Sequence, residues 1–128
     1  MSIRSPLARA RGLGSAKQGV DHWWRQRLSA VALVPLSLWF AFSVASHVGD
    51  GYQAVLAWLS SPITAVALSL YLTVACYHSQ LGIQVVVEDY VHHEWVKLGL
   101  LVITQFVNLL LAVAAVFALL SIAFGAAS

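Results

Sequence analysis

The chain alternates between long uncharged runs and short polar segments. Residues 28–48, 63–87 and 98–124 contain no Asp, Glu, Lys or Arg. A helix needs roughly 18–20 predominantly apolar residues to cross a hydrocarbon core, and each of these runs is longer than that. Lipid cannot satisfy backbone polar groups, so a spanning segment must be helical. The pattern therefore predicts an all-α integral membrane protein with three transmembrane helices, the first of which contains Pro35 as a candidate kink.

Composition strengthens this prediction. The chain of 128 residues is 60% hydrophobic and only 9% charged, and its mean hydropathy is +0.81. A soluble globular chain carries about 25% charged residues, so a lipid bilayer is the better solvent for this one. The single cysteine, Cys76, excludes an intrachain disulfide and cannot form a metal cluster alone, so we interpret it as a small apolar packing residue.

The basic residues predict the orientation in the membrane. Six of the seven Lys and Arg residues precede the first run, and the seventh, Lys97, lies between the second and the third. Basic residues concentrate on the inner side of membranes, so the N-terminus and the 88–97 loop should face the cytoplasm or the matrix, and the C-terminus should face out. The net charge of +2 is thus explained by the orientation in the membrane, and nucleic acid is not expected as a partner.

Residues 1–18 are expected to form a basic tail ahead of a three-helix domain at residues 19–128. The tail contains no Asp or Glu and lacks the apolar core of a secretory signal. We interpret it as a surface-lying or disordered tail, with a mitochondrial transit peptide as the alternative. The first interpretation corresponds to a bacterial inner membrane, which we expect, and the second to a mitochondrial inner membrane.

His78 is the titratable residue that lies deepest in an uncharged run. It precedes Asp89 by eleven residues, which at 1.5 Å per residue places it roughly 16 Å from the inner boundary. Gly82, Val85 and Asp89 share its helix face. A mid-helix glycine costs about 1 kcal/mol relative to alanine, and beside a histidine it leaves room for a flat, large ligand. A haem bound through imidazole fits that shape, and the alternative is a histidine hydrogen-bonded to a neighbouring helix.

Two further polar positions lie at the inner boundary. Arg27, at the start of the first run, is placed to contact haem propionates, and the alternative is an anchor at the membrane surface. Tyr90 directly follows the second run and is placed to donate a hydrogen bond to a quinone carbonyl. An interfacial aromatic residue is the alternative for Tyr90.

Other polar residues have simpler interpretations. Gln105 and Asn108 are three residues apart in the third run and predict hydrogen bonds between helices. His92 and His93 lack the spacing of a metal-binding helix motif and are expected in a solvated loop. His47 ends the first run and is expected at the outer surface.

The spacing in the second run resembles that of a known family. His78-x-x-x-Gly82 followed by Asp89-Tyr90 is similar to the signature of the small hydrophobic membrane anchor of bacterial and mitochondrial succinate dehydrogenase, also called the cytochrome b small subunit. The stretch RLSA at residues 27–30 resembles the family's Arg-x-Thr/Ser-Ala.

The resemblance extends beyond these motifs. The stretch GVDH at residues 19–22 resembles the Gly-Val-His-Asp of some members, with the acid and the histidine exchanged. Three spans with an inner N-terminus also agree, and the resemblance covers about residues 19–124.

This resemblance implies a cofactor site shared between two chains. The small anchor and a second three-helix chain, the partner cytochrome b subunit, would form one bundle with a haem b between them. His78 would be one axial ligand of the haem iron, and the partner cytochrome b subunit would provide the other. Arg27 would contact a haem propionate, and Gly82 would leave clearance for the macrocycle. The chain would then be half of a heterodimeric haem b bundle.

The resemblance also implies a place in electron transfer. Succinate would be oxidised on the flavoprotein subunit, and electrons would pass through the iron–sulfur subunit to ubiquinone in the membrane. Tyr90 would hydrogen-bond the quinone, and Asp89 would support that site by pairing with an arginine of the partner cytochrome b subunit. The chain would be a non-autonomous part of a succinate:quinone oxidoreductase, without activity alone.

Two other functions stay open from the sequence. An anchor of a fumarate reductase, or of another quinone-linked cytochrome b, would use the same residues in the reverse direction. In a haem-free helper or transporter subunit, His78 would instead relay protons or bind a substrate. A haem b Soret band would distinguish the succinate dehydrogenase anchor and the other quinone-linked cytochromes b from the haem-free subunit.

Overall fold

The computed structural model describes residues 16–125, with side chains from residue 19 onward. It contains helices α2 (Ala16–Ser46), α3 (Tyr52–Ser60), α4 (Pro62–Tyr90) and α5 (Glu94–Gly125), and no strand occurs among these residues. Three of the helices are long and apolar enough to cross a membrane, over Gly19–Ser46, Pro62–Tyr90 and Glu94–Gly125. The predictions of an all-α fold and of three candidate membrane spans are confirmed.

The helices extend past the uncharged runs that predicted them. α2 begins twelve residues before Leu28, and α4 includes Asp89 and Tyr90. A charged residue marks where a helix leaves the hydrocarbon, but it does not stop the helix, since water satisfies its last turns. Residues 1–15 of the predicted basic tail lie outside the described residues, and α2 already begins at Ala16.

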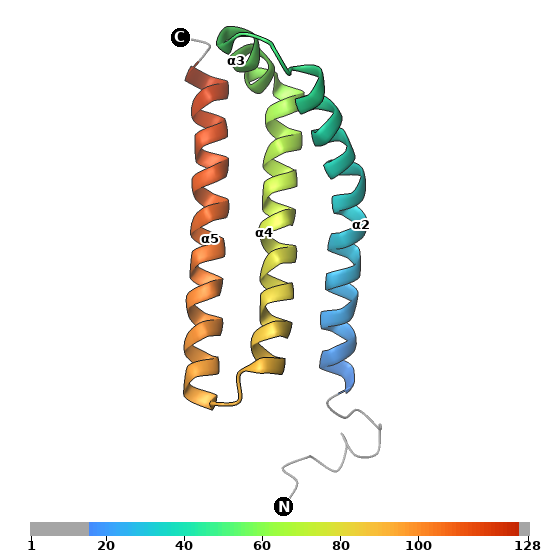
Figure 1. Ribbon diagram of the computed structural model, residues 1–128, viewed down its shortest axis with the longest axis vertical. Coiled ribbons are helices and arrows are strands. Elements are labelled where there is room, and N and C mark those ends of the chain that lie inside the picture. Colours follow the sequence, from blue (N-terminus) through green and yellow to red (C-terminus); the bar gives the residue numbers. More distant parts are fainter. Residues whose placement is uncertain (1–15, 126–128) are drawn as a thin grey trace, which may run out of the picture.

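The three long helices form a single layer with α4 in the middle (Figure 1). α4 packs against α2 on one side and against α5 on the other, whereas α2 and α5 do not touch within the described residues. α4 has 29 residues and α5 has 32, so at 1.5 Å per residue they are about 43 and 48 Å long. Both exceed the roughly 30 Å of a hydrocarbon core.

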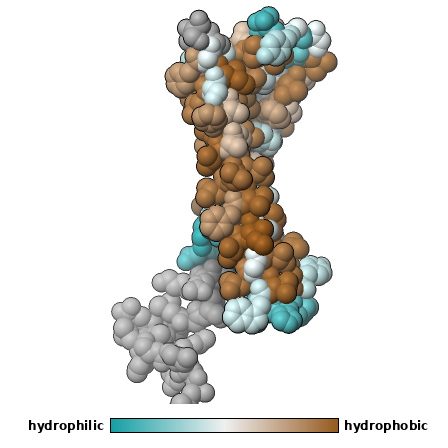
Figure 2. Space-filling view, turned by 90° about the vertical axis from the view of Figure 1, so that its left-hand side faces the viewer, coloured by the Kyte–Doolittle hydropathy of each residue, from teal (hydrophilic) through white to brown (hydrophobic). Residues whose placement is uncertain are grey.

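This layer buries few of its own side chains. The buried apolar residues in the described part of the chain are Ala65, Leu68, Leu81, Val87 and Leu119. Large apolar side chains such as Phe42, Phe106 and Phe117 are instead widely exposed, at 68–74%. The body of the molecule is apolar between polar ends (Figure 2). Lipid and other membrane helices can cover such a surface, whereas water would not be tolerated there.

Pro35 lies inside α2, which continues through it to Ser46. A proline in a helix removes one backbone hydrogen bond and pushes against the carbonyl one turn earlier. α2 is curved rather than broken (Figure 1).

Helix α3 was not predicted from the sequence. It has nine residues and lies in the segment expected to be an outer loop. Gly49, with a φ of 91°, allows the chain to turn after α2, and α3 then begins at Tyr52. The Trp58 ring stacks on His47 with centroids 4.7 Å apart, and Ser60 Oγ lies 3.5 Å from the Ile122 carbonyl of α5. These contacts hold α3 across one end of the layer. The predicted topology places this end outside, so we call it the outer end and the opposite end, where α4 finishes at Tyr90, the inner end.

The orientation can be tested by labelling single cysteines after Cys76 is replaced by serine. Asp50, in the turn before α3, and His92, in the link between α4 and α5, are both exposed and lie at opposite ends of the layer. With the N-terminus inside, a membrane-impermeant maleimide should label Asp50→Cys in intact spheroplasts. It should label His92→Cys only after permeabilisation, and the reverse pattern would contradict the predicted topology.

Candidate functional site

His78 lies near the middle of α4 and faces α2. Tyr90, at the inner end of α4, is twelve residues further on, which corresponds to about 18 Å along the helix. The His78 ring is partly buried, and its Nδ1 lies 2.8 Å from the Oγ of Ser29 on α2. The hydrogen bond to a neighbouring helix, one of two interpretations from the sequence, is thus present. It does not exclude the other, because an imidazole has a second nitrogen.

Ser29 belongs to this site, although no role was assigned to it from the sequence. It is one of two buried polar side chains in the described residues, at 7% exposure. Its Oγ lies 3.0 Å from the backbone carbonyl of Gln26, one turn earlier in α2. Ser29 is within the RLSA stretch, but a single sequence does not reveal which residue of another helix lies opposite it.

Gly82 also faces α2, one turn inward from His78. A Cβ added at Gly82 would have the amide Nε2 of Gln26 as its nearest neighbour, at 4.0 Å, which is ordinary contact. The space beside Gly82 therefore borders a side chain of the same chain. Its predicted role as clearance for a haem stays a prediction.

The inner half of the α2–α4 contact is polar. Besides the Ser29–His78 pair, His22 Nε2 and Gln26 Oε1 are buried and have no hydrogen-bond partner within the described residues. Buried polar atoms are normally satisfied, so these two need water or a partner from outside the described residues. A polar contact of this kind is unlike lipid-facing packing and marks this part of the layer as a candidate site.

Arg27 lies on α2, two residues before Ser29, and thus about 3 Å nearer the inner end than Ser29. Its side chain is exposed, and its guanidinium carbon lies 5.3 Å from the centre of the Trp23 ring. Arg27 makes no ion pair with an acidic side chain of the described residues. A guanidinium at this depth is free to bind an anionic group, and its contact with a haem propionate stays a prediction.

Asp89 and Tyr90 are the last two residues of α4. Both are exposed, and Tyr90 reaches 78%. Neither side chain makes a hydrogen bond within the described residues, in contrast to Glu88, which accepts one from Gln84 at 2.8 Å. Their carboxylate and phenol are available to a ligand or to another protein chain, and they lie about 18 Å from His78 along the helix rather than beside it.

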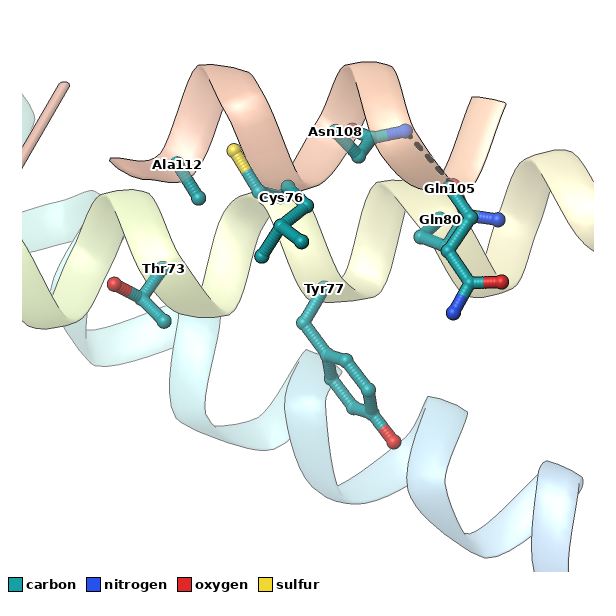
Figure 3. Close-up of a pocket in the computed structure, with 8 residues that line it drawn as sticks. Thr73, Cys76, Tyr77, Gln80, Gln105, Asn108 and Ala112 are labelled. Carbon is teal, nitrogen blue, oxygen red and sulfur yellow. Dashed lines mark hydrogen bonds between the residues drawn. The ribbon is translucent and has the colours of Figure 1, made fainter. Parts of the chain in front are cut away.

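A second polar group lies on the opposite side of α4, where α5 packs. The Asn108 amide donates a hydrogen bond to Gln80 Oε1 of α4 at 2.9 Å, so the predicted interhelical bond is confirmed for Asn108 (Figure 3). Gln105 makes no such bond within the described residues and is exposed, so its expected bond is absent there. It lines a groove of about 300 Å³ between the two helices, which Cys76 also lines.

The remaining histidines do not gather into a metal centre. No group of three or more His, Cys, Asp or Glu side chains in the described residues is placed to hold a metal ion. A haem iron is a different case, because the macrocycle occupies its equatorial positions and each axial position needs only one side chain. The half-buried His78, bonded through Nδ1 and with no hydrogen bond at Nε2 within the described residues, fits one axial position.

Comparison with known proteins gives a consistent picture. Residues 1–124 match the family described as succinate dehydrogenase/fumarate reductase transmembrane subunit. The succinate dehydrogenase hydrophobic membrane anchor subunit of Rickettsia conorii is 31% identical over 118 residues, covering 91% of this chain and 94% of the relative. The protein of that name from Paracoccus denitrificans is 34% identical over 90 residues, covering 70% of each chain.

A third relative is similar over a shorter part of the chain. The succinate dehydrogenase membrane anchor subunit of Reclinomonas americana is 33% identical over 81 residues, which covers 61% of this chain and 68% of the relative. No solved structure matches the chain.

Proposed function

The chain belongs to the succinate dehydrogenase/fumarate reductase transmembrane subunit family, and from this premise we propose that it is the membrane anchor of a succinate:quinone oxidoreductase. In this function it helps to bind haem b and to form the site at which ubiquinone is reduced. We place it in a bacterial inner membrane with the N-terminus in the cytoplasm, and a mitochondrial inner membrane is the alternative.

The position of His78 carries this proposal. The imidazole is held half-buried at mid-helix by Ser29, and Arg27 lies within one turn of its depth on the inner side. His78 would bind the iron, Arg27 would bind a propionate, and the gap at Gly82 would admit an edge of the ring. When bound, a haem b supplies a one-electron centre near the middle of the membrane. The second axial histidine would come from the partner cytochrome b subunit.

Asp89 and Tyr90 are proposed to form this chain's part of the quinone site. The Tyr90 phenol is exposed at the inner end of α4, where it can donate a hydrogen bond to a quinone carbonyl. Reduction of the quinone to the quinol consumes two electrons and two protons. Since this end of α4 meets water, the protons can arrive from the inner side without crossing the bilayer. Asp89, which has no ion-pair partner in the described residues, would order the site by pairing with an arginine of the partner cytochrome b subunit.

Other proteins would have to supply the electrons. The described residues contain no group of side chains placed to hold a metal cluster, so this part of the chain offers no relay from a dehydrogenase site to the quinone. The flavoprotein subunit would oxidise succinate, and the iron–sulfur subunit would carry the electrons to the quinone. We therefore expect no turnover from this chain alone.

Fumarate reduction by the same parts is the second candidate. The family description covers both enzymes, whereas the relatives named above are all succinate dehydrogenase anchors. That naming favours succinate oxidation. A haem-free helper or transporter subunit is the less favoured candidate.

Purification of the tagged chain from membranes under mild detergent tests the proposal. We expect three further proteins to copurify in equal amounts: the partner cytochrome b subunit, the iron–sulfur subunit and the flavoprotein. The complex should show a haem b Soret band and should reduce ubiquinone with succinate. A colourless chain that purifies without these proteins would refute the anchor function, and a complex that only oxidises quinol with fumarate would favour the second candidate.

A further inference from the structure

We propose that Ser29 is a positioning residue for His78. Its hydroxyl fixes the imidazole as the tautomer protonated at Nδ1, which leaves the lone pair of Nε2 for the haem iron. The hydroxyl also raises the electron-donating strength of that nitrogen. This inference rests on the proposed function, because it assigns the way in which this chain prepares the ligand that His78 supplies.

The assignment follows from counting hydrogens at one oxygen. Ser29 Oγ has two neighbours at hydrogen-bond distance, the Gln26 carbonyl at 3.0 Å and His78 Nδ1 at 2.8 Å. A serine hydroxyl has one hydrogen, and a carbonyl oxygen can only accept. If the hydroxyl donates to Gln26, its lone pairs face His78, and the hydrogen in the second bond must come from Nδ1.

The opposite assignment would leave a weaker arrangement. If the hydroxyl donated to His78 instead, the contact between Ser29 Oγ and the Gln26 carbonyl would place two acceptors 3.0 Å apart with no hydrogen between them. Nδ1 would then be unprotonated, and the neutral ring would carry its hydrogen at Nε2, the nitrogen that must bind iron. Only protonation at Nδ1 satisfies both contacts of Ser29 and leaves Nε2 as a ligand.

Burial strengthens the hydrogen bond between Ser29 and His78. Ser29 is 7% exposed and the His78 ring is partly buried, so water does not compete freely for either group. A hydrogen bond in such a setting is electrostatically stronger than one in water. Metal-ligating histidines generally donate their other N–H to a fixed acceptor, which sets the ring orientation and increases ligand basicity. The hydroxyl of Ser29 is such an acceptor, held by its own helix.

The effect should appear in the midpoint potential of the haem. A more basic axial nitrogen stabilises the ferric form over the ferrous form, so removal of the acceptor should raise the potential. One hydrogen bond of ordinary strength corresponds to a change of roughly fivefold in the ferric-to-ferrous equilibrium. At about 59 mV per tenfold for one electron, that is a rise of about 40 mV.

The experiment compares three variants in the assembled complex: Ser29→Ala, Ser29→Thr and Ser37→Ala. Threonine keeps a hydroxyl that can bond the carbonyl one turn earlier. Ser37 lies two turns further along α2, is also partly buried, and makes no hydrogen bond through its side chain in the described residues. Potentiometric titration of the b-type spectrum and the electron paramagnetic resonance of the oxidised haem are measured, with haem content per flavin.

The proposal expects Ser29→Ala to raise the potential by the stated amount, with Ser29→Thr and Ser37→Ala near the parent value. Loss of haem in Ser29→Ala alone, with haem retained in Ser29→Thr, would also support a required hydroxyl. An unchanged potential in Ser29→Ala, or loss of haem in both Ser29 variants, would overturn the inference, since the position would then matter only for packing. A parent complex without haem would instead refute the proposed function itself.

Discussion

Replacement of His78 by alanine is expected to abolish the low-spin b-type spectrum of the assembled complex. The change removes the imidazole that Ser29 holds at mid-helix and puts no other ligand in its place. Loss of a residue that only supports a metal ligand typically costs 10- to 100-fold in affinity, so loss of the ligand itself should cost more than about 100-fold. Haem content per flavin and the reduced-minus-oxidised difference spectrum measure this effect.

His47→Ala is the matched control for this variant. His47 is also partly buried and hydrogen-bonded through Nδ1, to the Ser43 carbonyl at 2.8 Å, but it lies beyond the outer end of α2. We expect its spectrum to equal that of the parent complex. An unchanged spectrum and potential in His78→Ala would remove this residue from the haem site.

A comparison of two glycines tests the proposed clearance at Gly82. Gly82→Leu should lower the haem content more than Gly99→Leu, because Gly99 lies on α5 with nothing within 4 Å of an added Cβ. A leucine at Gly82 would meet Gln26 as well as any ligand in the gap. Equal haem content in the two variants would mean that Gly82 serves helix packing only.

Replacement of Tyr90 by phenylalanine is expected to slow succinate–quinone turnover by roughly 5- to 150-fold. The ring stays and only the hydroxyl is lost, so the change removes one hydrogen bond to the quinone carbonyl. If the quinone carbonyl is partly buried in the assembled complex, such a bond is worth about 1–3 kcal/mol, and each 1.36 kcal/mol changes a rate about tenfold. Turnover with ubiquinone and turnover with a phenazine acceptor are measured on the same preparation.

Two comparisons make the Tyr90 result specific. Phenazine-linked succinate oxidation and haem content should stay at the parent values, because neither depends on the quinone carbonyl. Tyr77→Phe should leave all three quantities unchanged, since Tyr77 is another exposed tyrosine of α4 but lies a turn outward of Gln80, far from the inner end. Full quinone turnover in Tyr90→Phe would identify Tyr90 as an interfacial residue and place the quinone elsewhere.

The sequence predicted those features that depend on transfer of side chains into lipid. An uncharged run that exceeds the thickness of a hydrocarbon core is stable there as a helix. Helices α2, α4 and α5 could therefore be expected. Helix ends could not, because they lie in the interface, where water satisfies the backbone in either conformation. α3 was missed for the same reason: nine apolar and polar residues at an interface give no period long enough to identify a helix.

Contacts between helices were the least predictable features. Asn108 was expected to bond another helix, but its partner Gln80 depends on how far α4 and α5 slide past each other. The bond between Ser29 and His78 depends likewise on the register of α2 against α4. Periodicity places a residue on a face of its own helix, but it does not show which residue of the neighbouring helix lies beside it. For His78 the two interpretations from sequence proved compatible, since each uses a different nitrogen.

The two connections between the long helices differ greatly in length. α4 and α5 are joined by only three residues, 91–93, whereas α2 and α4 are joined by fifteen, which include α3. A three-residue link has almost no spare length, so it ties the height of Tyr90 to the start of α5. Insertions and epitope tags are best tolerated where the backbone is exposed and few contacts depend on it. For this chain that place is the outer turn at Gly49–Gly51, while even a one-residue change in the inner link would be transmitted to the end of α4 that holds Asp89 and Tyr90.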